Sequence, residues 1–479
     1  MNENCMNSYL QLIQKLRECN EGEKPQIFKA NAQLLEPKVV KIIIGLAKES
    51  NDNDNQNDAD FLTNIALEMG EFIGSNRQSI EIRKETADVL FKWGKDKFHS
   101  QLVVAFYCWQ KCLIIYQGIC DRQGEASCLI NLGHAYYSQG SEEALNYYQQ
   151  SLPISREIKN RQKEAVALGG LGNIYFFMGQ IEKAIDYHQQ SLNIGIEIND
   201  HPVKASSLGS LGNVYDSVGE YEKAIDYHKQ HLAICVEIND PRGEATCLNN
   251  LGIAYLSMGE YKKAIDYHQK SFSISNKIND PRGEASSLGG LGNACLFLGQ
   301  IEAAIIYHKK SLVIKRQIKD PRGEANSLGS LGTAYDCLGQ YEKAIDYHKQ
   351  HLAISRQIKD PRGEADSLGN LGNAYDSLGE YEKAIDYHKQ HLAISQKIKD
   401  RRGEASSLGG LGNAYNSLKQ YKEAIHYHEK CLAISKEISD SRGQAAAFGN
   451  LGLVYKFMEQ YEQAIHYYEK CLEIGRAHV

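Results

Sequence analysis

Three pairs of histidines have the residue type and the spacing to bind a metal ion. The members of each pair are three residues apart: His228 and His231, His348 and His351, and His388 and His391. On a helix this spacing brings both rings to one face, but a zinc site needs three or four ligands. No carboxylate or cysteine stands at a spacing that completes the set. We therefore expect no metal and no other cofactor.

An acidic run near the N-terminus is the second candidate metal site. Residues 51–58, NDNDNQND, place three aspartates at the spacing of a calcium-binding loop. Such a loop needs a glycine for its sharp turn and a glutamate as bidentate ligand, but Asn57 and Thr63 occupy those positions. We therefore interpret the run as a solvated linker.

A unit of 40 residues organises most of the chain. The stretch 361–400, PRGEADSLGNLGNAYDSLGEYEKAIDYHKQHLAISQKIKD, recurs with small changes and begins also at residues 161, 201, 241, 281, 321, 401 and 441. Self-similarity at such a period is typical of a solenoid, in which each unit buries its apolar faces against its neighbours. The polar residues therefore come in near-copies, whereas an active site is one preorganised constellation. We predict that the chain is not an enzyme.

Each unit is expected to form two helices. Asp360 is a good N-cap and Pro361 suits the first helical position, so one helix should run from there to about Ser377. Gly379 stands where a left-handed residue commonly ends a helix, and a second helix should follow from Tyr381 to about residue 397. The second helix is apolar on two sides, which only a stack of units can bury.

The histidines fit this repeat better than they fit a metal site. The first histidine of each pair recurs at the same position of other units, as His188, His268, His308 and His428. We interpret it as a residue of the helix packing. The second is replaced by a small residue elsewhere, as in Ser191, Ser271 and Cys431.

The unit resembles a known family. Leu368, Leu371, Gly372, Tyr375 and Ala384 fit the spacing L-x2-L-G-x2-Y followed by A, which resembles the tetratricopeptide (TPR) signature. The 40-residue length, the Tyr-His pair and the D-P-R-G-E-A connection are similar to the LGN/Pins family and to many bacterial TPR proteins. The resemblance implies an all-α superhelical solenoid of antiparallel helix pairs that binds peptides.

Three regions are expected. Residues 1–58 form a helical region of three short helices ending in the polar linker, and residues 59–120 form a degenerate TPR-like capping unit whose core Trp93 and Trp109 fill. Residues 121–479 form nine repeats. The segment YLQLIQKLRECNEGEKPQIFKANAQLLEPKVVK resembles a leader found before TPR arrays in cyanobacterial proteins, some of which continue into a caspase-like CHAT protease domain.

The composition limits the classes of partner and the cellular compartment that we expect. The formal net charge is −6, from 54 basic and 60 acidic residues that are interspersed, so nucleic acid and membrane surfaces are disfavoured. No run approaches 18 apolar residues and the N-terminus lacks the layout of a secretory signal, which favours a cytoplasmic protein. Twelve cysteines without a C-x-x-C pair favour free thiols.

The family geometry places the first helix of each unit on a concave groove. The asparagines near its Leu-Gly pair are candidate partner contacts: Asn173, Asn213, Asn293, Asn370, Asn373, Asn413 and Asn450. Asparagine donates and accepts hydrogen bonds, so a ladder of them suits a peptide backbone. The arginines at the start of the helix are candidates for partner carboxylates: Arg242, Arg282, Arg322, Arg362, Arg402 and Arg442. The alternatives are that asparagine is merely tolerated on a solvated helix face and that the arginines only form surface pairs with neighbouring acids.

We predict a protein-interaction scaffold that binds a partner peptide or helix in this groove. One alternative is the sensor part of a larger enzyme such as a CHAT protease, and another is an LGN-like modulator of G-protein signalling. The last unit lacks a polar capping helix, and residues 474–479, IGRAHV, resemble a translated adapter sequence. We therefore expect the chain to be an incomplete copy of its protein, or to cover its open last repeat by self-association.

Overall fold

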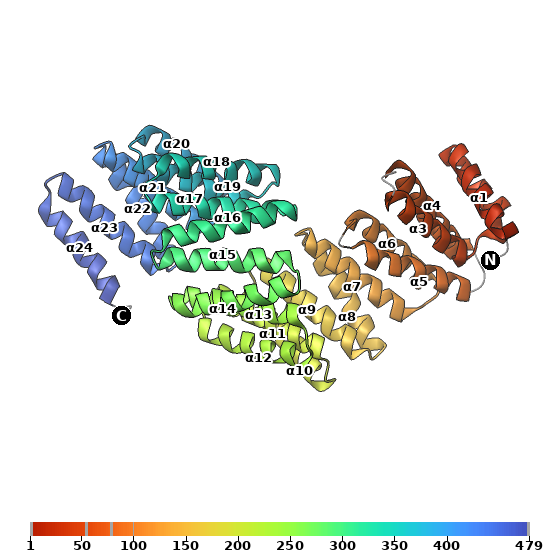
Figure 1. Cartoon of the computed structure of the whole chain (residues 1–479). Helices are drawn as coiled ribbons and strands as arrows, with labels where there is room; N and C mark the ends of the chain where they lie inside the picture. The colour runs from red at the N-terminus through yellow and green to blue at the C-terminus, as the bar shows by residue number, and fades with distance from the viewer. Residues whose placement is uncertain (1–2, 53–55, 77–79, 99, 477–479) are drawn as a thin grey trace. The chain divides into compact units, whose positions relative to one another are not determined.

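The computed structural model describes residues 3–52, 56–76, 80–98 and 100–476. These residues form 24 α-helices and two short 3-10 helices, with no strand among them. The chain divides into two compact units, Met1–Ile234 (unit 1) and Cys235–Val479 (unit 2). Within each unit, successive helices pack against one another in chain order (Figure 1). The expected all-α solenoid of antiparallel pairs is confirmed.

Unit 1 begins with helices that do not follow the repeat. They pack on a core that contains Leu12, Val39 and Ile65, all at most 1% exposed, and Trp93 and Trp109 are buried beside it, as expected. The helices of the unit are α1 (Glu3–Glu18), α2 (Lys24–Ala30), α3 (Pro37–Asp52), α4 (Gln56–Asn76), α5 (Ile80–Lys97), α6 (Leu102–Gly118), α7 (Arg122–Ser138), α8 (Ala144–Glu157), α9 (Arg161–Phe177), α10 (Ile181–Glu197), α11 (His201–Ser217) and α12 (Tyr221–Glu237).

Two details of unit 1 differ from the sequence prediction. The second short helix, for which the sequence predicts residues 24–35, spans only Lys24–Ala30 as α2, and 3-10 helices occupy Glu21–Glu23 and Ala32–Leu34 on either side of it. Most of the expected linker at 51–58 is helical: α3 extends to Asp52 and α4 begins at Gln56, and only residues 53–55 lie outside the described chain. A polar run can extend an exposed helix end, since helix termini are solvated.

Unit 2 contains six pairs of helices, in which the first of each pair is called the A helix and the second the B helix. The last turn of α12 belongs to it as well. The A helices are α13 (Pro241–Ser257), α15 (Pro281–Phe297), α17 (Pro321–Cys337), α19 (Pro361–Ser377), α21 (Arg401–Ser417) and α23 (Ser441–Phe457). The B helices are α14 (Tyr261–Lys277), α16 (Ile301–Gln317), α18 (Tyr341–Gln357), α20 (Tyr381–Lys397), α22 (Tyr421–Glu437) and α24 (Tyr461–Arg476).

Local residues set where these helices begin and end. The side chain of Asp360 accepts a hydrogen bond of 3.2 Å from the backbone N–H of Gly363, which caps α19 as predicted. Gly379 has a φ of +83° and ends the same helix. Lys399 adopts a φ of +58° after α20, where the backbone N–H of Asp400 closes the turn on the carbonyl of Ser395 at 2.8 Å. The bounds of α19 and α20 agree with the predicted ones.

Aromatic pairs join the two helices of a repeat and extend to the repeat before it. Tyr375 of α19 stacks on Tyr387 of α20, with ring centroids 5.3 Å apart and planes inclined by 6°. The ammonium groups of Lys383 and of Lys349, from the preceding repeat, lie 5.3 Å and 5.8 Å from the Tyr375 centroid. Each repeat is therefore stabilised partly by contacts that its neighbour supplies.

Buried histidines fill the space between repeats. His388 is 2% exposed, and a Cβ atom added to Gly372 of its own repeat or to Gly410 of the next would lie 2.6 Å or 2.4 Å from its imidazole ring. Two A helices therefore approach one imidazole so closely that only glycine fits. This confirms that the first histidine of each pair belongs to the helix packing.

Unfolding should proceed in stages, because repeats contact only their neighbours. We expect calorimetry of the whole chain to give a van't Hoff enthalpy well below the calorimetric enthalpy. Equal enthalpies, together with coincident transitions by tryptophan fluorescence and circular dichroism, would contradict this prediction. Trp93 and Trp109 both lie in unit 1, so fluorescence follows that unit alone.

Candidate functional site

The A helices of unit 2 line a hollow of about 510 Å³. Its walls come from α15, α17, α19 and α21, and its floor includes side chains of the B helices α18 and α20. Three of the predicted asparagines line it: Asn293, Asn370 and Asn373. The remaining lining residues are Asn326, Gly329, Ser330, Thr333, His351, Asp366, Gly369, His388, His391 and Ser406.

Helical spacing explains why these side chains share one face. Asp366, Asn370 and Asn373 follow one another at intervals of four and three residues on α19, so they lie on one side of the helix. Leu368 and Leu371 lie on the other side and are fully buried. The core residues of the repeat therefore fix the direction in which the polar residues point.

A second hollow of about 280 Å³ adjoins the first. Asn293, Asn326 and Ser330 line both, and Asn249 and Ser286 line the second one only. The Nδ1 atom of His268 lies 3.0 Å from the Oδ1 atom of Asn249, so this asparagine is held by the histidine beneath it. The polar face thus continues from α13 to α21 within unit 2.

The floor of the larger hollow contains the second histidine of two pairs. His351 is 5% exposed and His391 is 6% exposed, and their rings lie against Gly329 and Gly369 of the A helices. A Cβ atom at either glycine would be 2.9 Å or 3.0 Å from the imidazole. Several other repeats have a serine at this position, and Ser311 donates a hydrogen bond of 2.8 Å to a backbone carbonyl of the A helix.

The protonation of the site follows from burial. Burial lowers the pKa of His351 to about 4, and the neighbouring His348 lowers it further, whereas Asp360 opposes the shift. Burial also lowers the pKa of His391. Both rings are therefore neutral at pH 7. The pKa of Asp366 is raised, because the surrounding protein partly desolvates the carboxyl group and Asp400 and Asp360 repel its charge.

The other predicted asparagines lie elsewhere. Asn413 of α21 and Asn450 of α23 are joined by a hydrogen bond of 3.2 Å, which Asn450 donates. Asn173 and Asn213 lie on α9 and α11 of unit 1 and line neither hollow.

The predicted arginines are exposed at the starts of the A helices, and two of them pair with an acid of the same array. The guanidinium of Arg242 lies 3.4 Å from the carboxylate of Asp280, and that of Arg322 lies 3.5 Å from the carboxylate of Asp360. Both acids are the N-cap residues of the next A helix, and the side chain of Asp360 accepts a capping hydrogen bond there. Four others are exposed without such a pair among the described residues: Arg282, Arg362, Arg402 and Arg442. The paired arginines link consecutive repeats.

Sequence reasoning missed several residues of the hollows, namely Asn249, Asn326, Ser330, Thr333 and Asp366. Asparagine recurs at one repeat position, whereas the face also includes the positions three, four and seven residues earlier. Helical spacing applied to Asn373 would have identified Asp366. Its charge stands out because the equivalent residues Ser286, Asn326 and Ser406 are neutral.

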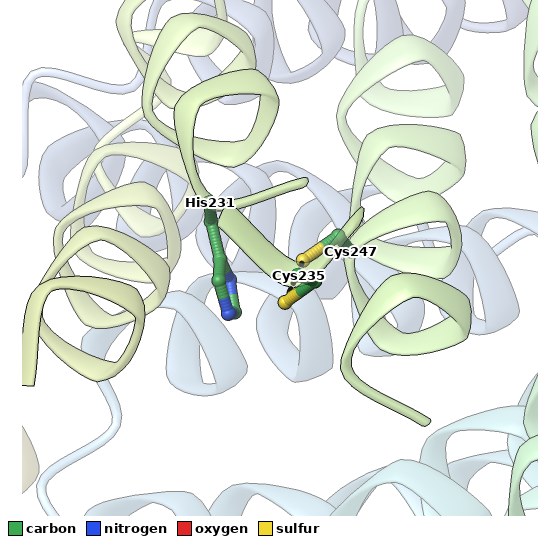
Figure 2. A group of neighbouring side chains, drawn as sticks. All are labelled: His231, Cys235 and Cys247. Carbon is green, nitrogen blue, oxygen red and sulfur yellow. Dashed lines mark hydrogen bonds between the residues drawn. The ribbon is translucent and has the colours of Figure 1, made fainter. Parts of the chain in front are cut away.

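Cysteines near the start of unit 2 are the described side chains best suited to a soft metal ion. The Sγ atoms of Cys235 and Cys247 are 4.0 Å apart, and both thiols are buried. His231 precedes Cys235 by one turn of α12 (Figure 2). Burial raises the pKa of both thiols, so a metal would have to displace their protons. Cys235 stands four residues after His231 on the same helix, so the expectation that no cysteine has a suitable spacing to the histidine pairs is wrong for this pair.

No helix in the described ranges is long and apolar enough to span a membrane.

Two family models, both described as Tetratricopeptide repeat, match the sequence. One matches residues 163–237, 217–277, 243–317, 283–357, 323–397 and 403–477, and the other matches residues 126–158. Together they cover well over half of the chain. The chain belongs to the tetratricopeptide repeat family. No curated protein matches the sequence as a relative.

Solved structures share the fold at low sequence identity. A Rap protein complexed with Competence and Sporulation Factor is 15% identical with a TM-score of 0.54, over 74% of this chain and 98% of that one. The apo quorum sensor NprR from B. thuringiensis is 14% identical with a TM-score of 0.53, over 75% and 99%. The STAND protein PH0952 from Pyrococcus horikoshii, which has a tetratricopeptide repeat sensor, is 17% identical with a TM-score of 0.51, over 91% and 72%.

Proposed function

We propose that this protein is a non-catalytic scaffold that binds a peptide segment or helix of a partner protein along the A helices of its repeats. The observation that carries the proposal is the larger hollow of unit 2. Asn293, Asn370 and Asn373 line its walls, and the buried imidazoles of His351 and His391 lie in its floor. The fold and the family membership support a role in protein interaction.

The chemistry of the hollow suits a polypeptide backbone. A peptide segment presents N–H donors and C=O acceptors, and an asparagine side chain can satisfy either. We propose the same role for the asparagines outside the hollow, namely Asn173, Asn213, Asn413 and Asn450. The exposed arginines would contact partner carboxylates, although Arg242 and Arg322 would have to exchange their present acids.

Structures of similar fold support ligand recognition by such arrays. The Rap protein was solved with Competence and Sporulation Factor, and NprR is described as a quorum sensor. The repeats of PH0952 are described as a sensor. That description favours a second candidate function for this chain, the sensor part of a larger enzyme. The CHAT protease and the LGN-like modulator rest on the resemblances in the sequence alone.

The groove proposal predicts that binding depends on the asparagines of the hollow. Peptides selected on the full chain from a displayed random library serve as probes, and their affinity is measured by fluorescence anisotropy. The triple variant Asn293→Ala, Asn370→Ala and Asn373→Ala should weaken binding by about tenfold or more, since each lost hydrogen bond contributes about 0.5–1.5 kcal/mol. Far-UV circular dichroism and the melting temperature should not change, because these side chains face solvent.

A matched control lies on a B helix of the same repeat. Glu382 and Lys389 of α20 are both exposed and line neither hollow. The double variant Glu382→Gln and Lys389→Ala should leave peptide affinity within about twofold of the original. The groove proposal is wrong if the asparagine variant keeps its affinity while this control loses it.

A further inference from the structure

One charged residue stands out in the larger hollow of unit 2. Asp366 is the single carboxylate among the described residues that line it, and no lysine or arginine lines it. The equivalent positions of the neighbouring repeats hold Ser286, Asn326 and Ser406. At this position, therefore, only the repeat of α19 carries a negative charge among these four repeats.

The charge of Asp366 is not neutralised within unit 2. Asp366 makes no ion pair in the described part of the chain, and Arg362, one turn earlier on α19, opposes the rise of its pKa without pairing with it. Asp360, which repels it, is itself held by Arg322 and by the backbone N–H of Gly363. Asp366 is an exposed residue at the hollow, and the like charges of Asp360 and Asp400 leave its carboxylate without a cationic partner among the described residues.

Unsatisfied acceptors lie in the floor beneath it. The imidazole of His351 is 5% exposed, and neither of its ring nitrogens has a hydrogen-bond partner in the part of the chain that the structure describes. The Nδ1 atom of His391, which is 6% exposed, also lacks one. Ser311 satisfies its hydroxyl at the same repeat position, so the histidines of these two repeats leave unused hydrogen-bonding capacity in the floor of the hollow. A neutral imidazole offers one acceptor nitrogen.

We propose that this hollow recognises an arginine side chain of the partner segment. A guanidinium group carries five N–H donors and no acceptor, and its planar fork matches a carboxylate. Asp366 would supply the charge and two acceptor oxygens. The oxygens of Asn326 and Asn370, and a ring nitrogen of His351 once a small side-chain shift uncovers it, would receive the remaining donors. The inference rests on the groove proposal and adds to it the type of partner residue that the groove recognises.

Lysine and glutamate fit the same hollow less well. A lysine ammonium is a compact point charge with three donors, so it satisfies fewer of the acceptors arranged around Asp366. A glutamate would place a second carboxylate beside Asp366 with no base lining the hollow. The volume of about 510 Å³ has room for a long side chain together with part of its backbone.

The test compares blocked nine-residue alanine peptides that differ only in the central residue, which is arginine, citrulline, lysine or glutamate. Citrulline has nearly the shape of arginine without the charge. Binding to the full chain is measured at pH 7 by fluorescence anisotropy, extended to millimolar concentrations. We expect the arginine peptide to bind at least about tenfold more tightly than the citrulline peptide, and the glutamate peptide to bind most weakly.

Variants assign the preference to the hollow. Asp366→Asn should reduce the difference between arginine and citrulline to within twofold while leaving the citrulline affinity as it was. His351→Ser introduces the serine that several other repeats have at this position. It should weaken the binding of the arginine peptide alone. Asp386→Asn, on the exposed face of α20, should leave the affinity for both the arginine and the citrulline peptide unchanged. Because the folded chain gains nothing from the Asp366 charge, Asp366→Asn should not lower the melting temperature.

The outcomes separate this inference from the groove proposal. If all four peptides bind equally and the asparagine triple variant weakens them all, the groove proposal stands and the arginine inference is wrong. If the arginine preference persists in Asp366→Asn, the charge that attracts arginine lies elsewhere and the inference is wrong. If no peptide binds, both proposals fail.

Discussion

The folded array should lose stability steeply as the pH falls from about 6.5 towards 4. Six histidines have a pKa that burial lowers to about 4: His188, His268, His308, His351, His388 and His428. In the unfolded chain a histidine has a pKa of about 6.5. Below that pH the unfolded chain takes up protons that the folded chain refuses, so acid favours unfolding.

The sign and the size of this effect follow from proton linkage. The stabilisation from a neutral buried histidine is fully present above pH 6.5 and is lost as the pH falls towards the folded pKa. At pH 5 each such histidine costs about 2 kcal/mol, from about 1.4 kcal/mol per pKa unit over 1.5 units. Because the histidines are spread over successive repeats, the loss affects most of the array. We expect urea midpoints measured from pH 7.5 to 4.5 to fall with a slope well above that of a chain without buried histidines.

Replacement of one of these histidines tests the cause. Tyr148 occupies the same repeat position in an earlier unit, where it lies against Gly133 and Gly170 as His388 lies against Gly372 and Gly410. A six-membered ring therefore fits between two such glycines, and His388→Phe should fold. This variant should remove from the pH slope about the contribution of one histidine. His426→Gln, at an exposed position of α22, is the control and should leave the slope unchanged. A slope in His388→Phe equal to that of the unchanged chain would contradict this explanation.

The helices of the repeat could be predicted from the sequence because their boundaries depend on neighbouring residues. Asp360, Pro361 and Gly379 act within one turn of the chain, so their effect can be recognised without a tertiary structure. The helices before residue 121 were located less well, since no repeated copy there distinguishes an essential residue from an incidental one. For this reason the sequence analysis interpreted the polar run at 51–58 as a linker, although most of it is helical.

The candidate site could be predicted only in part. Asn373 was found because it recurs at the same repeat position, and Asp366 was missed because it does not recur. The environment of His351 depends on how closely α17 approaches α18. The residues next to His351 in the sequence do not determine this distance. The same limit applied to Arg322, whose ion pair with Asp360 joins two repeats. Features that repeat could be read from the sequence, and features that distinguish one repeat from another required the structure.

Substitution of Gly372 by alanine should destabilise the array strongly. The new Cβ atom would lie 2.6 Å from the Cε1 and Nε2 atoms of His388, a contact far inside van der Waals distance. The imidazole has little room to retreat, because Gly410 of the next repeat lies so close to it that a Cβ atom added there would be 2.4 Å from the ring. Overpacking of a filled core costs about 1–3 kcal/mol, which exceeds the gain of about 0.5–1 kcal/mol from a better helix former. Urea unfolding followed by circular dichroism should show the loss.

Gly409→Ala, in the A helix of the following repeat, is the matched control. The nearest atom to its new Cβ atom would be the Sγ atom of Cys431 at 3.7 Å, an ordinary contact. Only the helix-propensity term remains there, so this variant should be more stable than the original chain by about 0.5–1 kcal/mol. The two substitutions are chemically identical and lie in A helices of adjacent repeats, so opposite signs would isolate the contact with His388. If both glycines tolerate alanine, the close approach of the A helices to the buried histidines is not what requires glycine.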